Sequence, residues 1–266
     1  MTQDAVRLRL EVAYDGTDFH GWASQPGLRT VQGTLEAALA AVLRVPSAAV
    51  VCAGRTDAGV HALMQVVHLD TSVQREPFSW VRGTNRYLPH DIAVQWCQPV
   101  ADSFHARNSA QGRRYRFKLL ESAVRPSLES GLVGWAFKPL DLKAMQQAAT
   151  LLVGEHDFSS FRAANCQSPT PVKTLRSLDI QRCGAYWCFD FDANAFLYHM
   201  VRNIMGCLVA VGQGAQPPGW LNDVLAAKRR DAAAPTFPAD GLYFVGPYYD
   251  ESHAIPRHTP AMDWIA

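Results

Sequence analysis

The sequence predicts an α+β fold built from two ferredoxin-like halves, each with the element order β-α-β-β-α-β and a largely antiparallel sheet. Two observations predict this class. Short segments in which apolar and polar residues alternate are typical of strands with one buried face, and stripes of apolar residues at helical spacing lie between them. The same succession of elements then occurs twice along the chain, although the two halves share no obvious sequence identity.

The first half contains all six elements of one such unit. Its first strand is predicted where Leu8, Leu10 and Val12 alternate with charged residues, which indicates one buried face. Thr30 can cap a helix whose apolar stripe runs to Leu43, because a threonine hydroxyl accepts hydrogen bonds from the first turn. The remaining elements are strands near 49–53 and 65–70, a helix over about 77–87 and a strand at 92–96.

The second half repeats this pattern. Alternating residues predict strands at 115–119, 178–180 and 187–191, and helical spacing predicts helices at 142–153 and 197–211. A short helix near 220–228 and a last strand at 242–245 complete the repeat. The segment 154–161 is interpreted as a structural loop after the 142–153 helix.

We expect the boundary between the halves near residues 103–112, which divides the chain into 1–107 and 108–266. No low-complexity linker separates the two, so we expect them to pack with their sheets side by side. That arrangement would leave a catalytic cleft between the halves, since clefts between domains are common binding sites.

The composition is that of an ordered protein, because 48% of the 266 residues are apolar and 18% are charged. The formal net charge is +1, so nucleic-acid binding would depend on basic residues gathered on one face. No signal peptide and no membrane span are expected, since the amino-terminal residues are charged and later apolar stretches are interrupted by polar residues. The six cysteines include no C-x-x-C pair, which argues against a zinc site and favours a reducing, cytoplasmic compartment.

One loop concentrates residues that can carry chemistry. Between the second and third strands, Gly54 and Gly59 bracket Arg55 and Asp57. Glycine permits a positive φ and close approach of the backbone, so such a loop can press against a ligand. Side chains two residues apart in an extended segment point the same way, which places the guanidinium and the carboxylate on one side. A tight turn with a solvated ion pair would show the same short pattern.

The complete segment from Gly54 to Ala62 resembles the signature of the tRNA pseudouridine synthase A family. Further blocks resemble motifs of that family and occur in its order, so the resemblance covers nearly the whole chain. These blocks are Tyr14–Trp22, Leu88–Ile92, Ser103–Arg107, Gly154–Phe161, Asn194–Asn203 and Gly241–Tyr243. Two positions depart from the family pattern, with Ala23 in place of a common glutamine and Asn108 in place of an aromatic residue.

This resemblance implies an isomerase that converts uridine to pseudouridine in tRNA. The family acts on the anticodon stem-loop, at positions 38, 39 and 40 of the tRNA, and works as a homodimer. The implied enzyme uses no metal and no cofactor, and its expected partners are tRNA and a second copy of the chain. The sequence agrees in containing no nucleotide-binding fingerprint, zinc-protease motif or serine-nucleophile motif.

The resemblance also implies roles for four residues. Asp57 is the essential aspartate, which must be ionised to add to the sugar or base or to assist glycal formation. Arg202 is its basic partner, because a nearby opposite charge favours the ionised carboxylate. Arg55 enters the space left by a flipped uridine, and Tyr115 stacks on the flipped base. Taken alone, Arg202 would be a surface helix residue and Tyr115 a core aromatic.

Basic residues recur in three clusters of the second half. Such runs are usually solvated faces, but on a tRNA-binding protein they would follow the phosphate backbone and make binding salt-dependent. The sequence does not distinguish among the three. The clusters are Arg113, Arg114, Arg116 and Lys118; then Lys173, Arg176 and Arg182; then Lys228, Arg229 and Arg230.

Two other functions are compatible with parts of the pattern. An RNA-binding module without catalysis shares the element order but usually carries an aromatic motif on a central strand, and we find no convincing copy. An aspartate-nucleophile hydrolase or phosphatase would need a magnesium site with several acids, and Asp57 has none close by in the sequence. Replacement of Asp57 by alanine tests the first alternative, and inhibition by EDTA would support the second.

Overall fold

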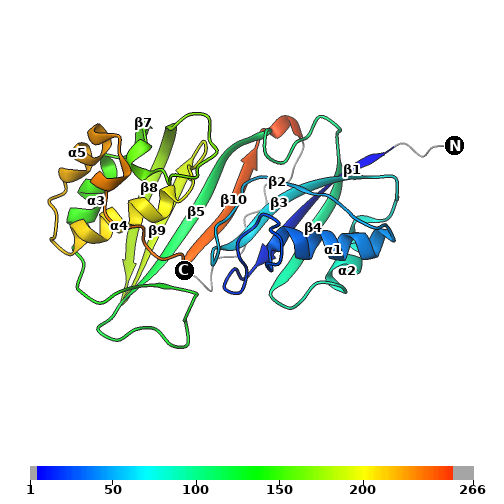
Figure 1. Ribbon diagram of the computed structural model, residues 1–266, viewed down its shortest axis with the longest axis horizontal. Helices are drawn as coiled ribbons and strands as arrows, with labels where there is room; N and C mark the ends of the chain where they lie inside the picture. Colours follow the sequence, from blue (N-terminus) through cyan, green and yellow to red (C-terminus); the bar gives the residue numbers. More distant parts are fainter. Residues whose placement is uncertain (1–4, 254–266) are drawn as a thin grey trace. The chain divides into compact units, whose positions relative to one another are not determined.

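The computed structural model describes residues 5–253, which fold as two compact units (Figure 1). Unit 1 comprises the described residues up to Gln111 together with those from Tyr243 on, and unit 2 comprises Gly112–Leu242. The units therefore meet in sequence at Gln111, and the last strand belongs to unit 1, whereas the division into 1–107 and 108–266 placed it in the second half. Among the described residues, no helix combines the length and apolar character needed to cross a bilayer.

Unit 1 has the predicted β-α-β-β-α-β order. β1 lies between β4 and β3 and is antiparallel to both, and the short β2 pairs antiparallel with β3. A further strand, β10 (Leu242–Tyr249), pairs in parallel with the start of β3. α1 and α2 lie beside each other (Figure 1). The elements are β1 (Val6–Tyr14), α1 (Val31–Leu43), β2 (Val51–Cys52), β3 (His61–Thr71), α2 (Pro77–Asn85) and β4 (Ile92–Val100).

Local sequence explains where α1 begins and ends. Thr30 caps its first turn, as predicted, because its hydroxyl oxygen accepts a hydrogen bond from the Gly33 amide at 3.3 Å. The helix ends at Arg44, which has a left-handed conformation with a φ of 59°. Each large apolar side chain that a helix buries contributes about 1.5–3 kcal/mol. The buried residues of α1 are Val31, Leu35, Ala38, Leu39 and Val42.

β1 is buried on both faces, so the prediction of a half-buried strand is wrong. Arg9 and Glu11, which alternate with the apolar residues, are each only 2% exposed. Arg9 Nη2 lies 2.7 Å from Glu11 Oε1, and the guanidinium lies 5.0 Å from the centre of the Trp96 ring. Charged side chains are buried when they are paired in this way. The alternation therefore identified which side chains share a face, while the ion pair allowed both faces to be covered.

The main strands of unit 2 follow the order β5-β9-β8-β7 and are antiparallel to one another, with β6 paired in parallel to the end of β5. The predicted strands and helices of this half are present. The segment predicted to be a loop, 154–161, instead forms β7 and a short 3-10 helix at Ser159–Phe161. The elements are β5 (Ala110–Glu121), β6 (Gly134–Ala136), α3 (Leu142–Thr150), β7 (Gly154–Asp157), β8 (Val172–Cys183), β9 (Tyr186–Ala193), α4 (Met200–Gly212) and α5 (Trp220–Ala227).

Candidate active site

The loop between β2 and β3 is anchored where it leaves the sheet. The backbone amide of Ala53 donates to the carbonyl of Val66 at 2.8 Å. The side-chain amide of Gln65, a fully buried residue, donates to the carbonyl of Gly54 at 2.6 Å. Both bonds tie the start of the loop to β3, so the backbone that follows begins from a fixed position.

Asp57 lies in the middle of this loop. Its backbone carbonyl accepts a hydrogen bond from the Val60 amide at 3.2 Å, which closes a turn in which Gly59 has a φ of 78°. The Asp57 residue is half-buried, whereas Arg55 on the same loop is exposed. The structure therefore places these two predicted site residues on one loop of unit 1, with Asp57 less exposed to water than Arg55.

The chain at the end of β1 braces the Asp57 loop. The hydroxyl oxygens of Tyr14 and Thr56 lie 2.8 Å apart, and both residues are buried. The amide of Trp22 donates to the carbonyl of Thr56 at 3.0 Å, and the amide of Gly59 donates to the carbonyl of Phe19 at 3.3 Å. Burial raises the pKa of the Tyr14 phenol, so its hydroxyl stays protonated.

Two glycines allow this segment to approach the loop closely. A Cβ atom at Gly16 would lie 2.1 Å from the carbonyl oxygen of Val60. Gly21 has a φ of 84°, and a Cβ atom there would lie 2.9 Å from the carbonyl oxygen of Thr56. Since glycine alone tolerates both the close approach and the positive φ, a larger residue at either position would displace the loop.

His61 stands where the loop re-enters the sheet. The residue is 2% exposed, and its ring stacks on Tyr243 with the centroids 4.6 Å apart. Its Nδ1 lies 3.0 Å from the Gly16 amide nitrogen and 3.1 Å from an Asp15 carboxylate oxygen. One ring nitrogen cannot accept from the amide and donate to the carboxylate at the same time. Because the backbone fixes the amide hydrogen, we assign Nδ1 as the acceptor of the Gly16 hydrogen bond.

A second motif supports the bracing segment. Arg29 binds Asp91 through two hydrogen bonds of 2.8 Å, and its guanidinium lies 4.1 Å from the centre of the Phe19 ring. Hydrogen bonding to Asp91 raises the pKa of Arg29, so the arginine stays charged. The amide of Asp15 also donates to the Asp91 carbonyl at 2.9 Å. The motif that contains Asp91 thus fixes the segment that holds the Asp57 loop.

The motif that contains Phe104 packs against β3 and β10. Phe104 is 1% exposed, and the Ala106 amide donates to Nδ1 of His68 at 3.1 Å. The hydroxyl of Tyr249 donates to the Ala106 carbonyl at 2.8 Å. Burial, together with the positive charge of Arg7, lowers the pKa of His68 to about 4. This motif is therefore part of the framework of unit 1.

Tyr115 and Arg202 belong to unit 2. Tyr115 lies on β5 opposite Phe191 of β9, is half-buried, and meets the Phe196 ring edge-on with the centroids 5.0 Å apart. Arg202 lies in the first turn of α4, and its Nε donates to the carbonyl of Phe237 at 2.9 Å. The amide of Phe237 donates in return to the Arg202 carbonyl at 3.1 Å. Contacts within unit 2 therefore orient both side chains.

A buried polar cluster adjoins Arg202. Asn203 has no exposed surface, and its side-chain nitrogen donates to the Phe161 carbonyl at 2.8 Å. Its side-chain oxygen accepts from the Thr236 hydroxyl at 2.7 Å, and that hydroxyl oxygen accepts from Arg230 at 2.9 Å. These bonds join the motif that ends at Asn203 to the one that ends at Phe161, so both fix the start of α4.

Several members of the basic clusters in unit 2 are paired with acids or buried. Lys118 and Lys173 are 8% and 7% exposed. A phosphate backbone would have to compete with carboxylates for some of the other residues. The pairs are Arg116–Asp190 at 2.7 Å, Arg176–Asp192 at 3.1 Å, Arg182–Glu121 at 2.8 Å, Lys228–Asp157 at 3.4 Å and Arg229–Asp231 at 3.5 Å.

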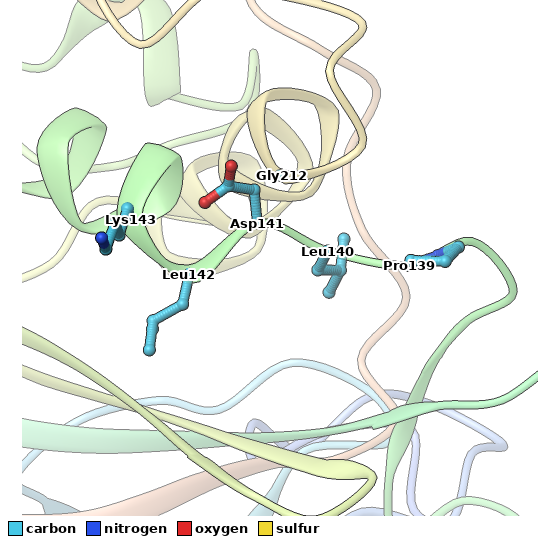
Figure 2. Close-up of a pocket in the computed structure, with 6 residues that line it drawn as sticks. All are labelled: Pro139, Leu140, Asp141, Leu142, Lys143 and Gly212. Carbon is cyan, nitrogen blue, oxygen red and sulfur yellow. The ribbon is translucent and has the colours of Figure 1, made fainter.

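A shallow depression lies elsewhere in unit 2, where α3 begins and α4 ends (Figure 2). Its volume is about 590 Å³, and Asp141 on its wall accepts a hydrogen bond from the Ala144 amide at 3.0 Å. That carboxylate therefore caps α3. Within residues 5–253, no three His, Cys, Asp or Glu side chains gather to hold a metal ion. The lining residues, Pro139, Leu140, Asp141, Leu142, Lys143 and Gly212, include none of the four predicted site residues.

Three residues beside the Asp57 loop were not identified from the sequence. Tyr14, Thr56 and His61 lie inside or next to recognised motifs, which was the available signal. Their partners are distant in sequence, since Tyr14 and Thr56 are 42 residues apart. Only the pairing of β1 with β3 brings the two motifs into contact.

Comparisons with known proteins agree on one family. The sequence profile of that family, described as tRNA pseudouridine synthase, matches residues 11–108 and 148–250. A tRNA pseudouridine synthase A from Methylibium petroleiphilum is 63% identical over 260 residues, which cover 98% of this chain and 100% of the relative. Proteins of the same name from Polaromonas naphthalenivorans and Polaromonas sp. are 61% and 58% identical over 264 residues, each match covering 98% of this chain and 100% of the relative.

Proposed function

Because this chain belongs to the tRNA pseudouridine synthase family, we propose that it converts uridine to pseudouridine at positions 38, 39 and 40 in the anticodon stem-loop of tRNAs. The chain is an isomerase of uridine in tRNA, and the positions within the tRNA are our assignment. In this reaction the bond between C1′ and N1 breaks and a bond between C1′ and C5 forms. The hydrogen at C5 leaves as a proton, and N1 gains one.

We assign Asp57 as the catalytic carboxylate. The observation that supports this role is that Asp57 is half-buried and directly follows Thr56, which hydrogen bonds hold in place on the same loop. A carboxylate held in this way can add to the sugar or the base, or assist glycal formation, without first having to be positioned. The reaction rearranges a single substrate, so its chemistry requires no oxidant, reductant or other cofactor.

We assign Arg55, Tyr115 and Arg202 to substrate binding. The exposure of Arg55 suits a guanidinium that fills the space of a flipped uridine, since flipping costs a few kcal/mol of unstacking. Tyr115 is held edge-on by Phe196, which leaves a ring oriented to stack on a base. Arg202 is oriented through its Nε, and its charge would favour the ionised form of Asp57.

The enzyme is further proposed to act in the cytoplasm as a homodimer that binds the anticodon arm of one tRNA with both subunits. Light scattering at working concentration measures the mass of the protein in solution and so tests whether it is a dimer. A mass of two chains supports the proposal, and a mass of one chain contradicts it.

The experiment that tests the function uses tRNA transcripts labelled with tritium at C5 of uracil, incubated with the protein in the presence and in the absence of EDTA. Formation of the bond to C5 expels the tritium into water. We expect release by the wild-type protein, loss of release by Asp57→Asn, and unchanged tRNA binding by that variant. Position is then read by mapping pseudouridine in the product.

Other outcomes distinguish the alternatives. Tight tRNA binding without release from any transcript would contradict the isomerase and favour a non-catalytic RNA-binding module. Full release by Asp57→Asn would contradict the role of Asp57 while leaving the isomerase intact. Release that EDTA abolishes would show that the reaction needs a metal.

A further inference from the structure

A buried pair of hydroxyl groups lies directly beside the residue that precedes Asp57. The hydroxyl oxygens of Tyr14 and Thr56 are 2.8 Å apart, and the two residues are 5% and 7% exposed. Neither hydroxyl has a part in the proposed chemistry. Buried polar groups of this kind are costly to leave unpaired, so each hydroxyl restricts the position of the other.

Tyr14 is itself rigidly placed. It is the last residue of β1 and lies opposite Ala62 of β3 and Ile92 of β4. Its ring contacts Phe19 edge-on at 6.4 Å and Trp22 at 6.2 Å between centroids. The phenolic oxygen therefore has a fixed position, and a hydrogen bond to it can hold a neighbouring loop in place.

Thr56 is held at two places by the same segment of the chain. Its side chain meets Tyr14, and its carbonyl accepts the Trp22 amide at 3.0 Å. Gly21, between these contacts, would bring a Cβ atom 2.9 Å from the same carbonyl oxygen and 3.1 Å from the Asp57 carbonyl carbon. The backbone on the amino-terminal side of Asp57 is thus confined by a hydrogen bond at the side chain and by close packing at the carbonyl.

We propose that Tyr14 is a positioning residue for the isomerisation, acting through Thr56 to fix the loop that presents Asp57. This inference rests on the proposed catalytic role of Asp57. Misplacement of a reacting group by about 1 Å can lower a rate by about 100-fold, so loss of one positioning hydroxyl has a measurable cost. The effect belongs to kcat, because Tyr14 holds the loop whether or not tRNA is bound.

The test compares Tyr14→Phe with Tyr249→Phe. Each substitution removes one phenolic hydroxyl that makes a 2.8 Å hydrogen bond in unit 1, but the Tyr249 bond goes to Ala106 and not to the Asp57 loop. We expect Tyr14→Phe to lower kcat for tritium release between about 10- and 100-fold, with KM and the Kd for tRNA within about twofold of wild type. We expect Tyr249→Phe to lower Tm about as much as Tyr14→Phe does, and to leave kcat within about twofold of the wild-type value.

A second pair of variants tests the same hydrogen bond at Thr56, so that the conclusion does not depend on the Tyr14 variant alone. Thr56→Val keeps the shape of the side chain and loses the hydroxyl, whereas Thr56→Ser keeps the hydroxyl. We expect Thr56→Val to reproduce the loss of kcat, Thr56→Ser to restore most of it, and Tyr14→Phe combined with Thr56→Val to cost no more than either alone. The shape of the pH–rate profile should not change, since a buried phenol that stays protonated does not titrate in the working range.

Three results would overturn the inference. The first is a kcat of Tyr14→Phe within about twofold of wild type, and the second is an equal loss in Tyr249→Phe. The third, decisive if Tyr14→Phe does not fold, is equal kcat in Thr56→Val and Thr56→Ser. In each case loss of activity in Asp57→Asn would leave the proposed function standing, whereas full activity of Asp57→Asn would refute the role of Asp57 independently of Tyr14.

Discussion

The His68 ring makes the stability of unit 1 sensitive to mild acid. Burial lowers its pKa from 6.5 to about 4, and Nδ1 accepts the Ala106 amide, a bond that protonation at that atom would break. The neighbouring titratable groups are Arg7 and His105, which disfavour a further positive charge, and Asp70, which favours one. Between pH 6.5 and 4 the unfolded chain therefore binds this proton more readily than the folded chain. Stability that is complete above pH 6.5 is lost as the pH falls through that range.

The size of this loss follows from the two pKa values. A shift of this size corresponds to about 2 kcal/mol at pH 5, and screening by solvent reduces it to about 1–2 kcal/mol. Urea unfolding at pH 7.5 and pH 5.0 measures the change in the free energy of unfolding. The His68→Asn variant offers an amide oxygen near the position of Nδ1 but does not titrate. We expect its decrease in stability between the two pH values to be smaller than that of wild type by this amount.

His90→Asn serves as the control, because this histidine is exposed on the same unit. We expect the control to lose as much stability between pH 7.5 and 5.0 as the wild-type protein. The reasoning would be refuted by a His68→Asn variant whose loss equals that of wild type, or by an NMR titration in which the His68 ring protonates near pH 6.5.

Two further pairs of variants test the framework of unit 1 by urea unfolding at pH 7.5. Gly16→Ala would place a Cβ atom 2.1 Å from a backbone carbonyl oxygen and should destabilise the protein by about 2 kcal/mol or more, whereas Gly83→Ala in α2, where a Cβ atom would come no closer than 3.7 Å to Val42, should not destabilise it. Glu11→Gln leaves the charge of Arg9 buried and should cost about 3–5 kcal/mol, while Asp70→Asn, at a half-exposed ion pair, should cost less than about 1 kcal/mol. Equal effects within either pair of variants would contradict the burial argument.

The sequence predicted most of the fold because long periodic segments carry their own signal. The helix that follows Thr30 and the strands at 6–12 and 187–191 repeat their spacing often enough to be recognised. β6 and β7 have three and four residues, too few for alternation to distinguish a strand from a loop. The burial of Arg9 and Glu11 was missed for another reason: a charge pattern does not reveal that its two members neutralise each other.

The sequence predicted which residues carry the chemistry of the candidate site, but it did not predict the contacts that hold them in place. The Asp57 loop was found because glycines, an arginine and an aspartate lie within a few residues of one another and match a family signature. The bond from Tyr14 to Thr56 joins two separate motifs, and the contact exists only after β1 and β3 have paired. Local spacing contains no information about such contacts, so they had to come from the fold.

The return of β10 to the first unit also bears on how the protein is made. His61 and Ala62 of β3 lie opposite Tyr243 and Phe244 of β10. This part of β3 therefore stays unpaired on that side until the ribosome has synthesised unit 2 and then β10. At about 5–20 residues per second, the interval is roughly 10 to 40 s. Among the described residues, unit 2 is one continuous segment of the chain. The pairing of β3, the strand that begins directly after the Asp57 loop, is therefore completed only after unit 2 has been synthesised, so a chain released before β10 would lack the strand that pairs with His61 and would expose an unpaired edge.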